Sequence, residues 1–98
     1  MEQMKINPVD QVFIDYESET ISQAVYVFRP VVYEDGNAYC CILGPDREAG
    51  IFGSGTTPKD AMEDWEQHVR ELITGPKKNN STAQYIINNI DKLIKFLR

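Results

Sequence analysis

The sequence predicts an α+β fold in which an antiparallel sheet of three to four strands packs against one helix and is followed by a C-terminal helix. Three observations support this prediction. Two runs rich in β-branched and aromatic residues flank an Asp-Gly pair, a Thr-Pro pair opens an amphipathic helical pattern, and residues 81–97 carry an apolar stripe at helical spacing.

The hairpin is the clearest local signal. Residues 24–34 are rich in Val, Tyr and Phe, Asp35-Gly36 follows, and residues 38–43 again favour a strand. Asp-Gly is a preferred centre for a tight turn whose twist matches that of two paired strands. Because Pro30 cannot donate a ladder hydrogen bond, we expect the first strand to run along a sheet edge there or to carry a bulge. That edge would be open to pairing with another chain.

A short third strand is expected around Ile51-Phe52, after a polar loop over residues 46–49. The helix that follows has the best-defined start in the chain. Thr57 can cap it through its hydroxyl, Pro58 suits the first helical position, and Asp60 can complete an imperfect capping box.

An apolar stripe runs along this helix up to Gly75-Pro76, a pair that typically ends a helix. Its members recur at helical spacing and are Ala61, Met62, Trp65, His68, Val69, Leu72 and Ile73. The stripe should face the sheet, so we expect Trp65 to lie in the core and His68 to be at most partly exposed.

The C-terminal helix, residues 81–97, follows the i, i+3, i+4, i+7 pattern without a miss. Its apolar positions are Ala83, Ile86, Ile87, Ile90, Leu93, Ile94 and Leu97. Such a stripe must be buried. It can pack on the sheet of its own domain or on the same helix of a second copy, and both interpretations stay open.

The N-terminal region carries two conflicting signals. Residues 7–10, Asn-Pro-Val-Asp, are typical of a helix start, whereas residues 12–16 have the β-branched and aromatic richness of a strand. We favour a strand for residues 12–16.

We expect one domain spanning residues 1–98, because 98 residues with 42% hydrophobic content can form a single modest core. No apolar run reaches the roughly 18 to 20 residues that a membrane span needs. The N-terminus lacks the basic start and apolar centre of a signal peptide. A cytoplasmic protein without membrane contact is therefore expected.

The net charge of −5 is unevenly distributed, since residues 1–75 carry −9 and residues 76–98 carry +4. An acidic body repels nucleic acid and favours basic protein partners. The basic residues of the second part could contact phosphate or neutralise neighbouring acids, and they are Lys77, Lys78, Lys92, Lys95 and Arg98. Nucleic-acid binding therefore stays open and rests on this C-terminal part alone.

The two cysteines, Cys40 and Cys41, are adjacent in an expected strand, so their side chains should point to opposite faces. That geometry disfavours a disulfide between them. A metal site would need further Cys or His at ligand spacing, and the sole histidine, His68, lies in a distant helix. We expect one buried cysteine and one partly covered neighbour, and no metal.

No catalytic, cofactor-binding or metal-binding residue is assigned, and no cofactor is expected. The run Gly50–Gly55 leads to a helix start, where anions are favoured, but it matches neither a P-loop nor a dinucleotide fingerprint; a tight strand-to-helix connection is the simpler interpretation. The acidic pairs Glu34-Asp35 and Glu63-Asp64 fall where solvent is expected. His68 has no evident nucleophile. We therefore expect no enzyme activity.

The order of strand, Asp-Gly turn, strand, glycine run and Thr-capped helix resembles the HicB-like antitoxin family. That family runs from an acidic Asp-Gly hairpin through Gly-x4-Gly-Asp-Thr-x-x-Glu-Ala into an amphipathic helix. Asp35-Gly36 matches the hairpin turn, and four residues fall at the spacing of the pattern, namely Gly50, Gly55, Thr57 and Ala61, with Thr56 and Asp60 as near-equivalents. The resemblance covers residues 25–73.

The resemblance implies a partial ribonuclease-H-like fold without nuclease activity. Proteins of this family typically cover the active surface of HicA, a small basic RNA-cleaving toxin, and carry a C-terminal DNA-binding module that represses their own operon. The chain departs from the family at residues 44–51, which replace a Pro-Asp-Leu-Pro-Gly-Cys stretch. It also offers a single C-terminal helix, which is at most half of a dimeric DNA-binding module.

Two functions follow as hypotheses. The first is a non-catalytic, antitoxin-like domain that masks a small basic RNA-cleaving partner. The alternative is a self-associating structural or regulatory module with no toxin partner. In either case a homo-oligomer, most simply a homodimer, is expected, because the hairpin edge and the apolar helical stripe both lack an obvious cover.

Overall fold

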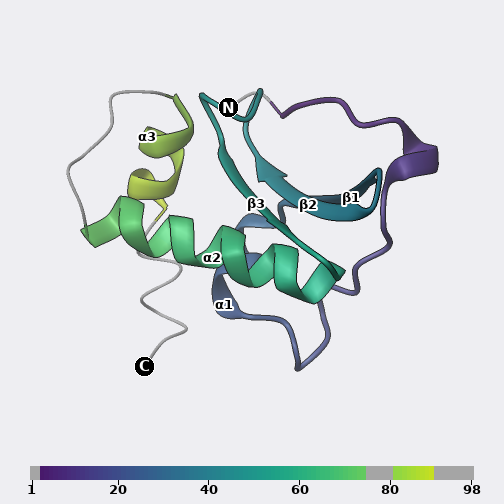
Figure 1. The fold of residues 1–98 in the computed structure, drawn as a ribbon. Helices are drawn as coiled ribbons and strands as arrows, with labels where there is room; N and C mark the ends of the chain where they lie inside the picture. The colour runs from purple at the N-terminus through teal and green to yellow at the C-terminus, as the bar shows by residue number, and fades with distance from the viewer. Residues whose placement is uncertain (1–2, 75–80, 90–98) are drawn as a thin grey trace.

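The computed structural model describes residues 3–74 and 81–89 of the chain. Its described elements are η1 (Pro8–Asp10), α1 (Gln23–Phe28), β1 (Val31–Asp35), β2 (Ala38–Leu43), β3 (Ile51–Gly55), α2 (Pro58–Thr74) and α3 (Ser81–Asn88). The three strands form one antiparallel sheet in the order β1-β2-β3, and α2 crosses one face of it (Figure 1). The predicted α+β class is confirmed.

The predicted hairpin is confirmed, with the loop one residue further along than expected. Asp35 pairs with Ala38, so Gly36 and Asn37 form the two-residue loop. Gly36 has a φ of 63°, a backbone conformation that glycine adopts without the steric cost of a side chain. The polar loop after β2 is also present, and Asp46 Oδ1 organises it by accepting bonds from the amides of Glu48 and Ala49 at 2.9 and 2.7 Å.

The predicted first strand over residues 24–34 is wrong in its first half. Gln23–Phe28 is a short helix, capped by the Ser22 hydroxyl on the Val25 amide at 3.2 Å. Its buried residues, Ala24, Val25 and Phe28, have helical spacing, so burial on one side outweighs the β propensity of Val, Tyr and Phe. Arg29 ends the helix in the left-handed conformation, with a φ of 49°. Pro30 therefore precedes the sheet and does not interrupt a strand.

Helix α2 begins as predicted and packs very closely on the sheet. The Thr57 hydroxyl accepts the Asp60 amide at 3.1 Å, and Trp65 is fully buried. A Cβ at Gly53 would lie 2.7 Å from the Ala61 carbonyl oxygen and on top of the Trp65 backbone. The glycine run is thus mainly strand β3, and its glycine at position 53 lets the α2 backbone approach the sheet.

The second face of the sheet is covered as well. Tyr33, Cys40 and Ile42 are buried there under the N-terminal residues Met4 and Ile6. The Met4 amide donates to the Gly44 carbonyl at 2.7 Å, which holds this segment in place. Cys41 faces α2 and Cys40 the other side, so opposite faces are confirmed. The expectation of one partly covered cysteine is wrong, because the N-terminal segment buries Cys40 too.

The predicted strand over residues 12–16 is wrong, because this segment does not form the hydrogen-bond ladder of a strand. Asn7 starts the 3₁₀ helix η1, and a single isolated bridge joins Gln11 to Tyr33 of β1. Exposure nevertheless alternates along residues 11–18, with the odd-numbered residues exposed and the even-numbered ones half-buried. An alternation in exposure with period 2 is typical of an extended chain. This segment therefore runs extended beside β1, but it does not pair with β1 as a fourth strand would.

Helix α3 packs on its own domain. Thr82, Ala83 and Ile86 are buried, and Tyr85 stacks edge-on against Phe28 of α1 with ring centroids 5.9 Å apart. Ala83 and Ile86 belong to the same core as Trp65 and Val69. The remaining predicted stripe positions, Ile90, Leu93, Ile94 and Leu97, and the predicted helix end at Gly75-Pro76 lie outside the described residues.

Candidate functional site

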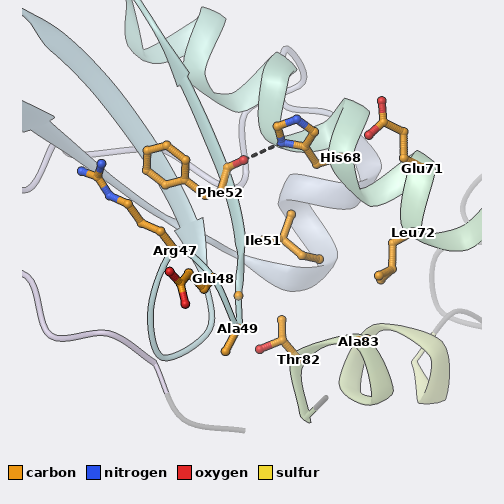
Figure 2. Close-up of a pocket in the computed structure, with 11 residues that line it drawn as sticks. Arg47, Glu48, Ala49, Ile51, Phe52, His68, Glu71, Leu72, Thr82 and Ala83 are labelled. Carbon is orange, nitrogen blue, oxygen red and sulfur yellow. Dashed lines mark hydrogen bonds between the residues drawn. The ribbon is translucent and has the colours of Figure 1, made fainter. Parts of the chain in front are cut away.

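A cavity of about 500 Å³ lies between the loop that leads into β3, the first residues of β3, the second half of α2 and the start of α3 (Figure 2). Buried Ile51 and Leu72 form its floor, and Arg47, Glu48, His68 and Glu71 line its rim. Its size falls within the range of small-ligand sites. Polar groups of both signs surround it, so its charge alone selects neither an anion nor a cation.

The Arg47 and His68 side chains at this rim are already engaged. His68 Nδ1 lies 2.5 Å from the Phe52 carbonyl oxygen, which can only accept, so Nδ1 carries the proton (Figure 2). The Arg47 guanidinium lies 4.5 Å from the centre of the Phe52 ring. Arg47 Nη2 also donates to Tyr33 Oη at 3.3 Å and to Asp35 Oδ2 at 2.9 Å. These two hydrogen bonds, in that order, raise the pKa of Arg47.

Thr82 is the only hydroxyl-bearing residue among the described residues that line the cavity, and none of these is a cysteine. Its hydroxyl is buried and has no hydrogen-bond partner, so neither His68 nor Glu71 forms a hydrogen bond with it. The residue instead packs over Gly44, where a Cβ would come within 2.6 Å of Thr82 Oγ1. Among the lining residues that the structure describes there is thus no nucleophile hydrogen-bonded to a base, the arrangement that covalent catalysis uses.

The outer edge of β3 is closed by side chains of α2. The Ser54 amide donates to Asp64 Oδ2 at 3.0 Å, and the Phe52 carbonyl accepts from His68. Asp64 and His68 stand one helical turn apart, with 3.9 Å between Asp64 Oδ1 and His68 Nε2. Two main-chain groups that a partner strand would need are therefore occupied, and this pair protects the edge.

The outer edge of β1 is covered differently. The Val12 amide donates to the Val32 carbonyl at 2.8 Å, and the Gln11 to Tyr33 bridge lies beside it. The segment that supplies these contacts exposes two large apolar side chains, Val9 at 88% and Phe13 at 89%. This edge is thus occupied by main chain that itself presents an aromatic side chain to solvent.

The charged side chains leave an excess of free carboxylates. Among residues 3–74 and 81–89, every arginine and Lys59 lies within 4.0 Å of a carboxylate, in pairs Arg29–Glu17, Arg47–Asp35, Lys59–Glu63 and Arg70–Glu66. Exposed carboxylates outside these pairs include Asp10, Asp15, Glu19, Glu34, Glu48 and Glu71. The described surface is therefore acidic with few free cations to offset it.

Several residues that the sequence offered as candidate catalytic groups instead make structural contacts. Of the acidic pairs, Asp35 and Glu63 form ion pairs and Asp64 caps β3. His68 is more exposed than expected, with 43% of its side chain accessible, because it sits at the sheet edge beyond Trp65. The sequence offered one overlooked signal, the i, i+4 spacing of Asp64 and His68. A second was the recurrence of apolar residues at every other position, Val12, Ile14 and Tyr16, followed by polar Asp15 and Glu17.

The cysteines lie in the sheet and show no sign of a reactive thiolate. Burial strongly raises the pKa of Cys41, and the neighbouring Cys40 raises it further. Burial also raises the pKa of Cys40, against a hydrogen bond with Tyr33 that lowers it. Within the described part of the chain, no three His, Cys, Asp or Glu side chains are grouped as a metal site would need. No described helix is long and apolar enough to cross a membrane.

Comparisons with known proteins add no relative. The chain matches no protein-family model, no curated protein and no solved structure. The HicB-like relationship therefore stays a prediction from the residues that resemble its pattern.

Proposed function

We propose that the chain is a non-catalytic, antitoxin-like protein-binding domain whose acidic surface masks a small basic RNA-cleaving protein. The observation that carries the proposal is the charge of the described surface. Its arginines are already paired with carboxylates, and at least six further carboxylates face solvent. A surface of this kind attracts a basic partner and speeds its docking.

The glycine and threonine positions support the HicB-like part of the proposal. Gly55 lies where a Cβ would come within 2.8 Å of the Ala61 amide nitrogen, and Thr57 caps α2. Gly55, Thr57 and Ala61 thus act together at one contact between helix and strand, whereas Gly50 packs against the backbone of the loop after β2. They support a shared architecture, while the acidic surface supports the choice of partner.

The test is co-expression with the small basic protein encoded beside the gene for this chain, where such a neighbour exists. We expect a stoichiometric complex, and we expect the RNA cleavage of the basic protein to cease in that complex. The chain alone should not cleave RNA with or without added Mg²⁺. Failure of a neighbouring basic nuclease to bind, or RNA cleavage by this chain that a single carboxylate replacement abolishes, would contradict the proposal.

The alternative, a self-associating module, keeps one observation in its favour. The outer edge of the N-terminal segment exposes Phe13, and the stripe beyond Ile87 lies outside the described residues. However, Ala83 and Ile86 are buried in the chain's own core, so the first part of the stripe does not need a second copy. Sedimentation at tens of micromolar separates the two: a homodimer is expected if the stripe pairs between chains, and a monomer if it does not.

The basic residues considered for DNA contact, Lys77, Lys78, Lys92, Lys95 and Arg98, all lie outside the described residues. No described feature favours nucleic acid, since the described surface is acidic. We therefore propose a protein partner only.

A further inference from the structure

The segment beside β1 is an extended chain with one side buried and the other open. Val12 and Ile14 pack against the main core, whereas Phe13 between them is 89% exposed. Val9, in η1, is 88% exposed. An isolated surface aromatic is ordinary, but this phenylalanine stands on backbone that its two neighbours anchor to the core.

The backbone at Phe13 is open as well. Because the Val12 amide donates inward to the Val32 carbonyl, the amide and carbonyl of the next residue in an extended chain point away from β1. Among the residues that the structure describes, nothing hydrogen-bonds to either main-chain group of Phe13. The same position thus offers a donor, an acceptor and an aromatic side chain.

The segment is held at both ends, which limits the entropy lost when a partner binds. Gln11 Nε2 donates to the Ile6 carbonyl at 2.9 Å, and Tyr16 Oη donates to the Pro30 carbonyl at 2.5 Å. A prearranged binding edge keeps more of its contact energy as affinity than a loop that must first be ordered. The β3 edge differs, since Asp64 and His68 already bond two of its outward groups, the Ser54 amide and the Phe52 carbonyl.

The charge of the segment indicates the kind of partner. Residues 9–19 contain four exposed carboxylates and no lysine or arginine, and the carboxylates are Asp10, Asp15, Glu17 and Glu19. Arg29 neutralises Glu17 at 2.6 Å, which leaves the other three unpaired by any described cation. A second copy of this acidic chain would be repelled here, whereas a basic segment would be attracted.

We propose that the outer edge of residues 11–15 is the contact surface for an extended basic segment of a protein partner, with Phe13 as its anchor. The partner strand pairs with the Phe13 amide and carbonyl, offers an apolar cleft to the Phe13 ring, and places lysines or arginines against Asp10 and Asp15. The inference rests on the proposed function in assuming a basic partner, and it assigns where that partner binds.

The experiment selects phage-displayed random nine-residue peptides on the full chain, and then measures each enriched peptide against variants by fluorescence polarisation. We expect basic peptides with β-branched or aromatic residues at alternate positions. Phe13→Ser should weaken their binding at least about tenfold, as loss of a central aromatic anchor usually does. Phe13→Trp should retain binding, and Gln67→Ser, on the exposed side of α2, should change it less than about twofold.

Backbone pairing has its own measurement. Adding an enriched peptide should slow hydrogen exchange at the Phe13 amide while leaving the Ser54 amide unchanged. The proposal is overturned if enriched peptides are not basic, if no peptide is enriched over a scrambled pool, or if Phe13→Ser binds them as well as the parent chain does. Unchanged melting of Phe13→Ser serves as the folding control.

The outcome is separable from that of the proposed function. If a basic RNA-cleaving protein binds Phe13→Ser and the parent chain equally well, the Phe13 assignment is contradicted and the antitoxin-like function is not affected. If basic peptides bind at Phe13 but no nuclease is inhibited, the Phe13 assignment stands and the antitoxin-like function is contradicted.

Discussion

The two outer edges of the sheet are protected by different means. At β3, α2 crosses so closely that Asp64 and His68 bond the outward main-chain groups of Ser54 and Phe52. At β1, a stretch of main chain makes one bridge at Gln11 and leaves Phe13 open. Side chains that bond to a strand edge create no new strand edge. An added chain segment, by contrast, has an outer edge of its own whose main-chain groups are unpaired. Within the described residues, unbonded main-chain groups therefore remain on the β1 side of the molecule, at Phe13.

The largest effect is expected at Gly53. This glycine lets α2 approach the sheet closely, and the close approach brings Asp64 and His68 to the edge of β3. Gly53→Val would place branched carbons on the Trp65 backbone, so α2 must move away from the sheet. We expect a loss of at least about 3 kcal/mol in the free energy of unfolding, measured by urea denaturation. The control is Ser54→Val, whose side chain points to the other face and should cost less than about 0.5 kcal/mol. Equal stability of the two variants would contradict the packing.

A smaller effect tests the alternation beside β1. Val12→Asp places a charge against the core and should cost about 2 kcal/mol, whereas Phe13→Asp one residue later should cost less than about 0.5 kcal/mol. Thermal and urea unfolding of both variants give the comparison. If the two costs were alike, residues 11–15 would not be an extended chain with one buried side.

The edge cap itself is expected to contribute less. Asp64→Ala removes the acceptor of the Ser54 amide, and because the Asp64 side chain is 42% exposed we expect a loss of only about 1 kcal/mol. Hydrogen exchange at the Ser54 amide should accelerate. Glu63→Ala, one residue earlier on α2, removes a carboxylate that bonds no strand and should leave that exchange rate unchanged. Equal exchange in both variants would reject the cap.

The smallest effect is expected at the far end of the N-terminal segment. Glu17→Gln breaks the ion pair with Arg29, whose two side chains are 68% and 50% exposed, and should change the stability by less than about 0.5 kcal/mol. Tyr16→Phe, at the adjacent residue, serves as the comparison. It loses the hydrogen bond to the Pro30 carbonyl and should lower the free energy of unfolding by about 1 kcal/mol. A costlier Glu17→Gln would show that the ion pair, and not Tyr16, holds the segment.

Local chemistry alone was sufficient for much of the fold. The Asp35-Gly36 turn, strand β2, the Thr57 cap and the burial of Trp65 each follow from a spacing or a residue type whose physical reason lies within a few positions. The same holds for the opposite faces of Cys40 and Cys41, since side chains alternate along any strand.

Tertiary contacts decided the rest. Residues 23–28 have strand propensity yet form α1, because Ala24, Val25 and Phe28 gain more by packing on α2 and α3 than Val and Tyr lose in a helix. Cys40 is buried because Met4 and Ile6 return over a face that the sequence left open. Whether an edge is closed depends on which distant group reaches it, so Asp64, His68 and Phe13 took on their roles only when α2 and the N-terminal segment met the sheet.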